Sequence, residues 1–279
     1  MTRRDALIRA TATLDPVSDT PRLDAELLLA HALGISREEL LLNDLEGDPP
    51  PAFAALLKRR LSHEPVAYIL GQRDFWTISV EVNPAVLIPR PDSETLIEAA
   101  VAYFGEEGPK RILDLGTGSG ALLLAALHQW PEANGTGIDS SAAALEVACR
   151  NAARIAPGRA VVAPGDWATG LEGRFDLILC NPPYIERTAS LPPSVVRHEP
   201  VSALFAGHDG LDDYRRIVPA LPSLLAAGGL IAMEIGSTQA EAVSALFRHV
   251  GLSPEMRCDL GGRPRAILHF GLGIGHEGR

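Results

Sequence analysis

The chain has 279 residues, of which 46% are hydrophobic, 22% charged and 5% aromatic, a balance typical of a soluble globular enzyme. Its net charge of −10 and pI of about 5.3 argue against broad binding to nucleic acid or to an anionic membrane. Because Cys149, Cys180 and Cys258 have no paired or metal-type spacing and no apolar run reaches membrane-spanning length, we expect a cytoplasmic protein.

The first 70 or so residues are predicted to be helical throughout. Apolar residues recur at helical spacing over Asp24–Leu33, and Gly34 is a suitable end for that helix. The segment Ser36–Glu39 has the form of a capping box, which predicts a second, short helix. Phe53–Leu61 forms a third amphipathic pattern. We therefore predict a small helical domain over residues 1–72, with no phosphate loop or catalytic triad of its own.

A connector follows the helical domain. Phe75–Val82 alternates with period two and is rich in β-branched and aromatic residues, which predicts a strand or hairpin. We assign residues 73–86 to this β-hairpin connector and residues 87–279 to a second domain. The second domain is expected to open with a helix over Ser93–Phe104.

From Arg111 onward the chain alternates between strand and helix patterns. This alternation predicts an α/β fold with a doubly wound sheet, whose ligands bind at the carboxyl ends of the strands. The expected strands are Arg111–Leu115, Gly135–Ile138, Ala160–Ala163, Phe175–Leu179, Leu230–Glu234 and Ala266–Phe270. The expected helices cover about residues 119–130, 141–154, 211–226 and 238–250.

A glycine-rich loop follows the first of these strands. Closely spaced glycines let the backbone turn tightly and approach a ligand without a Cβ in the way. The loop residues are Gly116, Thr117, Gly118, Ser119 and Gly120. Nineteen residues after Gly120, Asp139 ends the next strand, where a carboxylate can accept hydrogen bonds from both ribose hydroxyls of an adenosine. The pattern also satisfies the relaxed dinucleotide fingerprint, so the adenosine ligand stays ambiguous.

Asp114 directly precedes the loop, and two interpretations are open for it. Its carboxylate can reach the amino-acid end of S-adenosylmethionine, or it can be satisfied locally by the backbone.

The motif that separates these ligands is Asn181-Pro182-Pro183-Tyr184, at the end of the strand Phe175–Leu179. Such a segment, after a cofactor loop, is typical of methyltransferases that act on amino groups; a proline turn with a packing tyrosine is the structural alternative. An amide nitrogen is a poor nucleophile, so its methylation depends mainly on alignment. The Asn181 side-chain oxygen and the Pro182 carbonyl can accept hydrogen bonds from a target NH₂ and support its developing charge.

The other members of the motif have simpler roles. Proline rigidity fixes the Pro182 carbonyl, and Tyr184 offers an apolar wall to a planar amide. No separate general base is needed, because an alkylated amide loses its extra proton readily to water.

The chain resembles the HemK/PrmC family of protein-(glutamine-N5) methyltransferases, which modify the Gly-Gly-Gln loop of peptide chain release factors in translation termination. The resemblance extends from the amino-terminal helices almost to the end. Its motifs are Gly71–Trp76, Ile88–Glu94, Asp114–Gly120, Gly165–Trp167, Asn181–Tyr184 and Arg197–Pro200. One departure is His198, which stands where the family commonly has an aromatic residue.

This resemblance implies a Rossmann-like class I methyltransferase fold, S-adenosyl-L-methionine as cofactor, S-adenosyl-L-homocysteine as product, and no metal. The implied cofactor-binding residues are Gly116, Thr117, Gly118, Ser119, Gly120, Asp139, Trp167 and Asn181. The implied catalytic residues are Asn181, Pro182 and Tyr184, and the substrate site adds Pro183. Trp167 either flanks the adenine or is a core aromatic residue.

Other functions and roles stay open at this point. The nearest rival is a methyltransferase of adenine or cytosine amino groups in DNA, which needs a basic surface that the acidic composition disfavours. A nicotinamide dehydrogenase would leave the Asn181–Tyr184 segment unexplained. A non-catalytic adaptor protein is disfavoured because this segment, which can accept hydrogen bonds from a substrate amide, is intact. Arg197 and Glu199 either shape the substrate entrance or pair with each other, and Glu94 is either a site residue or a first-turn helix acid.

Overall fold

The computed structural model describes residues 1–43 and 45–272. The chain forms two compact units, one of residues 1–72 with 191–198, the other of residues 73–190 with 199–279. The hairpin segment over residues 73–86 thus lies in the second unit. The last seven residues of the expected catalytic domain, 273–279, lie outside the described residues.

The first unit is a helical bundle with its own apolar core. Its helices are α1 (Arg3–Leu14), η1 (Asp15–Val17), α2 (Pro21–Leu33), α3 (Arg37–Asn43), α4 (Pro51–Leu61), α5 (Val66–Leu70) and the single turn α9 (Pro193–Val196). Gly34 ends α2 in a left-handed conformation, and Ser36 and Glu39 exchange the two capping-box hydrogen bonds at 3.0 and 2.8 Å, which confirms both predicted signals. The helices α1 and α5 and the short turns η1 and α9 have no individual counterpart among the predicted helices.

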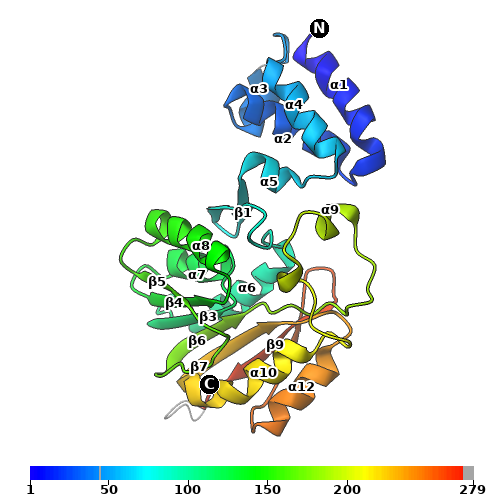
Figure 1. The fold of residues 1–279 in the computed structure, drawn as a ribbon. Coiled ribbons are helices and arrows are strands. Elements are labelled where there is room, and N and C mark those ends of the chain that lie inside the picture. The colour runs from blue at the N-terminus through cyan, green and yellow to red at the C-terminus, as the bar shows by residue number, and fades with distance from the viewer. Residues whose placement is uncertain (44, 273–279) are drawn as a thin grey trace. The chain divides into compact units, whose positions relative to one another are not determined.

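The second unit contains a seven-stranded sheet in the order β5-β4-β3-β6-β7-β9-β8, shown in Figure 1. Its strands are β3 (Arg111–Leu115), β4 (Asn134–Asp139), β5 (Ala160–Pro164), β6 (Phe175–Cys180), β7 (Leu225–Glu234), β8 (Glu255–Cys258) and β9 (Pro264–Phe270). The pairs from β5 to β7 are parallel, whereas β9 runs antiparallel to β7 and β8. The predicted doubly wound α/β sheet is confirmed.

Helices cover both faces of this sheet. In Figure 1, α6 (Glu94–Phe104), α7 (Ala121–Gln129) and α8 (Ala142–Ile155) lie on one side, with α10 (Asp212–Ile217) and α12 (Ala240–His249) on the other. The remaining short helices are η2 (Pro91–Ser93), η3 (Val201–Ala203), η4 (Val218–Ala220) and α11 (Leu221–Leu224). No helix in the described part of the chain is long and apolar enough to cross a membrane.

The helix predicted over residues 211–226 is wrong in its extent. The segment contains three short helical pieces, and β7 already begins at Leu225. Pro219 and Pro222 explain the breaks, because a proline has no N–H to donate within a helix and its ring clashes with the preceding turn.

The hairpin β1 (Gln72–Phe75) and β2 (Ile78–Glu81) is tied to the glycine-rich loop through one buried side chain. The amide of Asn151, on α8, donates to the main-chain oxygens of Glu81 at 3.0 Å and Ser119 at 2.9 Å, while its oxygen accepts from the Glu81 N–H at 2.8 Å. Both N–H groups and the oxygen of this amide are thereby bonded to two neighbouring backbones, which fixes the loop from one side.

Candidate active site

The glycine-rich loop makes the tight turn that the sequence predicts. Gly116, Gly118 and Gly120 have φ angles of +73°, +56° and +83°, in the left-handed region that favours glycine. The N–H groups of Gly116 and Thr117 both donate to the Ile138 carbonyl, at 2.8 and 2.9 Å. The loop therefore lies against the end of β4, at the carboxyl edge of the sheet.

Trp167 packs over this loop and lines the neighbouring cavity. Its indole N–H donates to Asp213 of α10 at 3.0 Å, and the partly buried ring also packs against the core of the sheet. A Cβ on Gly116 would lie 2.7 Å from this ring. The two interpretations of Trp167 are therefore compatible, because one face of the ring serves the core while the residue also forms cavity wall.

The contrast between two loop glycines gives a stability prediction. Gly118→Ala should cost about 1–2 kcal/mol of unfolding free energy, since the added Cβ meets nothing within 4 Å and only the left-handed backbone is penalised. Gly116→Ala should lose a further 1–3 kcal/mol or so by overpacking against Trp167. Urea denaturation of both ligand-free variants measures the difference. Equal losses would show that Trp167 does not pack tightly over Gly116.

Asp139 ends β4 with both carboxylate oxygens already oriented. One accepts from the Gly118 N–H at 2.8 Å and the other from the Ser141 N–H at 2.9 Å. Ser141 in turn caps α8 through its hydroxyl. Because each carboxylate oxygen has a second lone pair, Asp139 can still accept hydrogen bonds from a ligand while it holds the loop.

Asp114 is buried in the wall of the same cavity, 1% exposed. The Thr117 hydroxyl donates to its Oδ2 at 2.6 Å, but its Oδ1 has no hydrogen-bond partner among the described residues. Burial, with a contribution from the nearby Asp139 charge, raises the pKa of Asp114 to about 7. The Thr117 hydroxyl and the Leu123 backbone N–H oppose this rise, so local hydrogen bonding uses part of the acceptor capacity of the carboxyl, and Oδ1 has no partner within hydrogen-bond distance among the described residues.

The Asn181–Tyr184 segment follows β6 directly. The Asn181 side-chain NH₂ donates to the Ser93 hydroxyl at 3.0 Å, which leaves its carbonyl oxygen without that partner. Pro182 and Pro183 are buried, and the Tyr184 hydroxyl donates to Glu234 at 3.3 Å. Burial, reinforced by the Glu234 charge, raises the pKa of Tyr184 well above its usual value.

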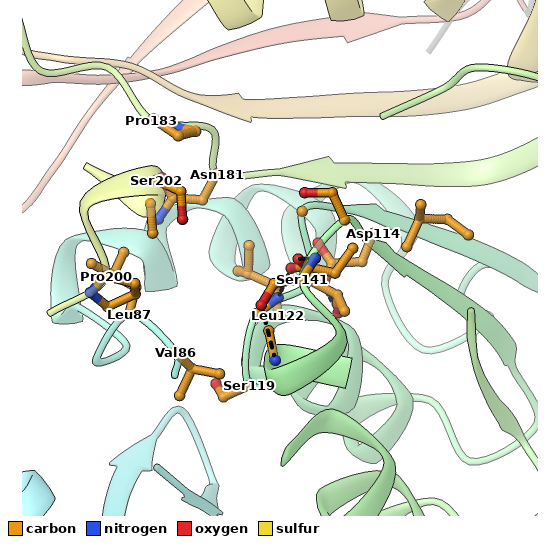
Figure 2. A pocket seen from close by; sticks show the side chains of 18 of the residues that line it. Val86, Leu87, Asp114, Ser119, Leu122, Ser141, Asn181, Pro183, Pro200 and Ser202 are labelled. Atoms are coloured by element: carbon orange, nitrogen blue, oxygen red, sulfur yellow. Dashed lines mark hydrogen bonds between the residues drawn. The ribbon is translucent and has the colours of Figure 1, made fainter. Parts of the chain in front are cut away.

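A cavity of about 310 Å³ joins these elements, as Figure 2 shows around Asn181, Asp114 and Ser119. Of the predicted site residues, it is lined by Gly116, Thr117, Gly118, Ser119, Asp139, Trp167, Asn181 and Pro183. Gly120, Pro182 and Tyr184 are not among its lining residues. A volume at the lower end of the range for small-molecule pockets suits an extended nucleoside ligand.

The sequence did not identify several lining residues. They are Phe75, Ala85, Val86, Leu87, Pro89, Ser93, Leu122, Ser141, Pro200, Ser202, Asp213 and Arg216, among others. Four of the first five, Ala85, Val86, Leu87 and Pro89, come from the chain just before and within the Ile88–Glu94 motif, which carried the resemblance but was not predicted to line the site. Proximity to that motif was the only signal for them.

The charged residues with open roles also have definite partners. Glu199 pairs with Arg90 at 2.5 Å and accepts from the Ile88 N–H at 3.2 Å, so the alternative pairing with Arg197 is wrong. Glu94 accepts from the Trp76 N–H at 2.8 Å and thus fixes the hairpin turn to α6. Neither carboxylate lines the cavity, and both hold its surrounding segments in place. Among the described residues, no group of three or more His, Cys, Asp or Glu could hold a metal ion.

Comparison with known proteins agrees with this site. A family model described as the PrmC N-terminal domain matches residues 5–71, and the Methyltransferase small domain matches residues 93–197. The release factor glutamine methyltransferase of Rhodospirillum rubrum is 46% identical, over 90% of this chain and 79% of that protein. Its counterpart from Moorella thermoacetica is 41% identical, over 97% of this chain and 99% of that protein.

The fold is similar to that of a solved methyltransferase from Pyrococcus furiosus. The TM-score is 0.53 at 19% identity, covering 70% of this chain and 89% of that one. At this identity the likeness shows the fold alone.

Proposed function

The chain belongs to the family of release factor glutamine methyltransferases, and on that premise we propose that it methylates the side-chain amide nitrogen (N5) of the glutamine in a release factor's Gly-Gly-Gln motif. S-adenosyl-L-methionine is the methyl donor that the methyltransferase family implies. The observation that carries the proposal is the Asn181 amide, whose NH₂ is held by Ser93 and whose oxygen is thereby left for a substrate.

The residues around the cavity fit this donor. Asp139 has free lone pairs for two ribose hydroxyls, and the glycine loop lets a ligand approach the backbone closely. The unpartnered Oδ1 of Asp114 is suited to the ammonium group of the amino-acid end. Trp167 would lie beside the adenine, and its bond to Asp213 supports a fixed ring. The product S-adenosyl-L-homocysteine would use the same residues.

When bound, the donor supplies an electrophilic methyl group on a positively charged sulfur. This chain's residues would then position the nucleophile. The Asn181 oxygen and the Pro182 carbonyl would accept hydrogen bonds from the substrate NH₂, which turns the nitrogen lone pair toward the methyl group. The same acceptors support the positive charge that develops on nitrogen, and this effect is larger in a buried site than in water. Tyr184 would hold the segment by its hydroxyl bond to Glu234.

The strand register supports a shared site for donor and acceptor. In the parallel pairing of β3 with β6, Leu115 lies opposite Cys180. The next residues along the two strands are Gly116, which begins the cofactor loop, and Asn181. Reactants bound to these neighbouring segments would meet without a conformational change in the sheet.

The helical first unit is proposed to recognise the protein substrate. Its apolar core is built from its own helices, and large apolar side chains on it stay exposed, including Ile8 at 59% and Leu42 at 80%. A glutamine on a loop offers little surface, so specificity for one protein requires contacts away from the reacting amide. We also expect a cytoplasmic location, no metal requirement, and no direct binding to nucleic acid or membrane.

The test compares a release factor with a short peptide that contains the same glutamine. Deleting residues 1–72 should raise the KM for the release factor roughly tenfold or more, the equivalent of about 1.4 kcal/mol of lost contacts. Peptide methylation and the Kd for S-adenosylmethionine should change little, and the unchanged Kd also controls for folding. Equal losses on protein and peptide would mean that the unit only stabilises the catalytic fold, and no methylation of the release factor by the full chain would refute the proposed function.

A further inference from the structure

Glu234 is a buried carboxyl group whose only part in the proposed reaction so far is to accept from the Tyr184 hydroxyl. It ends β7 and is 0% exposed. Because Cys180 of β6 pairs with Met233 of β7, the following residues, Asn181 and Glu234, lie at the same edge of the sheet. The Tyr184 hydroxyl donates to this carboxyl, so the Asn181–Tyr184 segment is in contact with Glu234. Burying a carboxyl group costs folding free energy, so its presence at this position needs an explanation.

Ser93 lies near this carboxyl and is bonded to the Asn181 amide. It ends η2, is 3% exposed, and its hydroxyl oxygen accepts from the Asn181 NH₂ at 3.0 Å. The same hydroxyl lies near enough to Glu234 to lower the pKa of that carboxyl, whose Oε1 accepts from Tyr184 and whose buried Oε2 has no hydrogen-bond partner among the described residues. A serine hydroxyl has a single proton, and a group that accepts from Asn181 must direct that proton elsewhere. The Oε2 of Glu234 is a nearby buried acceptor that still lacks a donor.

The direction of these hydrogen bonds determines which end of the Asn181 amide faces Ser93. If the Ser93 proton points to Glu234, only the NH₂ of Asn181 can complete the chain, and the carbonyl oxygen is left for the substrate. If Glu234 carries a proton, it can donate to Ser93, whose own proton is then free to bond the Asn181 carbonyl. The amide would then present its NH₂, a donor, to a substrate that also needs to donate.

We propose that Glu234 is a positioning residue for methyl transfer, which acts through the Ser93 hydroxyl to hold the Asn181 amide with its carbonyl oxygen toward the substrate. The inference rests on the proposed function of Asn181 as an acceptor for the glutamine amide. It adds Glu234, which does not line the cavity, and Ser93, which lines it and acts in this scheme through the Asn181 amide.

The groups around Glu234 keep its carboxyl close to the point at which the protonated and ionised forms are equally populated near neutral pH. Burial is the largest influence and raises the pKa of Glu234 to about 7, with Asp92 adding to the rise and Ser93, Arg265 and Tyr184 opposing it. The guanidinium group of Arg265, on β9, also forms ion pairs with Asp92 at 2.9 Å and with Asp259 at 3.2 Å. The Cys180 thiol and the Tyr214 hydroxyl also face this carboxyl, and both have raised pKa values that keep them neutral.

The proposal predicts a specific kinetic pattern for Glu234→Gln, which keeps the shape but places a donor where the carboxylate has an acceptor. The kcat should fall by about 10-fold to 100-fold, as expected for a misoriented catalytic group, with the KM for the release factor and the Kd for S-adenosylmethionine within a few-fold of wild type. In the wild type, kcat should fall as the pH drops through about 7, because Glu234 becomes protonated. That decrease should be absent in Glu234→Gln.

Three further variants separate positioning from general damage. Tyr214→Phe is the matched control, because the Tyr214 hydroxyl donates to the main-chain oxygen of Glu234 at 2.9 Å and not to its carboxyl group or to Ser93. The kcat of this variant should stay within about threefold of wild type. Asp114→Asn should retain the pH-dependent decrease due to Glu234, although Asp114 also titrates near pH 7. Ser93→Ala should lower kcat as Glu234→Gln does, and the double variant should lose no more than either single one.

The decisive readout does not depend on activity. In protein labelled with ¹⁵N-asparagine, the side-chain NH₂ signal of Asn181, assigned by its loss in Asn181→Asp, should shift with a midpoint near neutral pH. The shift should persist in Asp114→Asn and disappear in Glu234→Gln and in Ser93→Ala. A signal that does not titrate in the wild type, or that titrates equally in Glu234→Gln, would overturn the proposal. A wild-type protein that methylates no release factor would instead refute the proposed function. The titration would still decide whether Glu234 acts on the Asn181 amide through Ser93.

Discussion

Asn181→Ala should lower kcat for release factor methylation by about 10²–10³-fold, the usual effect of removing one polar group that acts on developing charge. The Asn181 oxygen is the acceptor left available by the bond to Ser93, and alanine removes it from the cavity wall. The Kd for S-adenosylmethionine should change only a few-fold, because the glycine loop, Asp114 and Asp139 are untouched. Single-turnover kinetics with saturating donor measures the chemical step directly.

Ser202→Ala is a suitable control, since Ser202 lines the same cavity on a different segment, as Figure 2 shows. Its turnover should stay within a few-fold of wild type. If Asn181→Ala also stays within a few-fold, the glutamine amide is oriented by other groups and the assignment of Asn181 is wrong.

Asp139→Asn should raise the Kd for both S-adenosylmethionine and S-adenosylhomocysteine by one to two decades. The carboxylate accepts from Gly118 and Ser141 and retains lone pairs for the ribose, and a charged hydrogen bond of this type contributes about 1.5–3 kcal/mol. The two ligands carry the same ribose, so their losses should match. Calorimetric titration checks this, with NAD as the control that the wild type should not bind.

The expected loss has two sources that a second variant separates. Asp139 also orients the glycine loop, so Ser141→Ala, which removes the α8 cap but keeps the carboxylate, measures the effect of local loosening alone. Its affinity loss should be clearly smaller. Unchanged affinity in Asp139→Asn for both ligands would locate the ribose elsewhere.

The parts of the site that follow from local sequence were predictable. The glycine loop and Asp139 each sit directly after a short apolar strand, so the strand pattern alone brings them to one edge of the sheet. The Asn181–Tyr184 segment is likewise contiguous. Residue type and position relative to a strand end were sufficient to identify these residues as candidates.

The supporting residues could not be predicted, because they depend on tertiary pairing. Ser93 and Glu234 lie far from Asn181 in sequence and meet it only through the position of α6 and the register of β6 with β7. A single serine before a helix resembles a cap, and a glutamate at a strand end resembles a surface charge. Only burial distinguishes them, and burial is a property of the whole fold.

Two errors in the predicted secondary structure, at β8 and around Pro219 and Pro222, also have physical reasons. The edge strand β8 has mostly exposed side chains and therefore no alternating apolar pattern to detect. The segment around Pro219 and Pro222 has helical spacing of its apolar residues but lacks the N–H donors that a continuous helix requires.

The most direct test of the proposed function is to locate the methyl group on the product. The full chain is incubated with a purified release factor and S-adenosylmethionine carrying an isotopically labelled methyl group, and the protein is analysed by fragmentation mass spectrometry. We expect one labelled methyl group on the side-chain amide nitrogen of the glutamine in the Gly-Gly-Gln motif, and no label when that glutamine is replaced by alanine. Label on another residue, or label that appears only on added DNA, would contradict it.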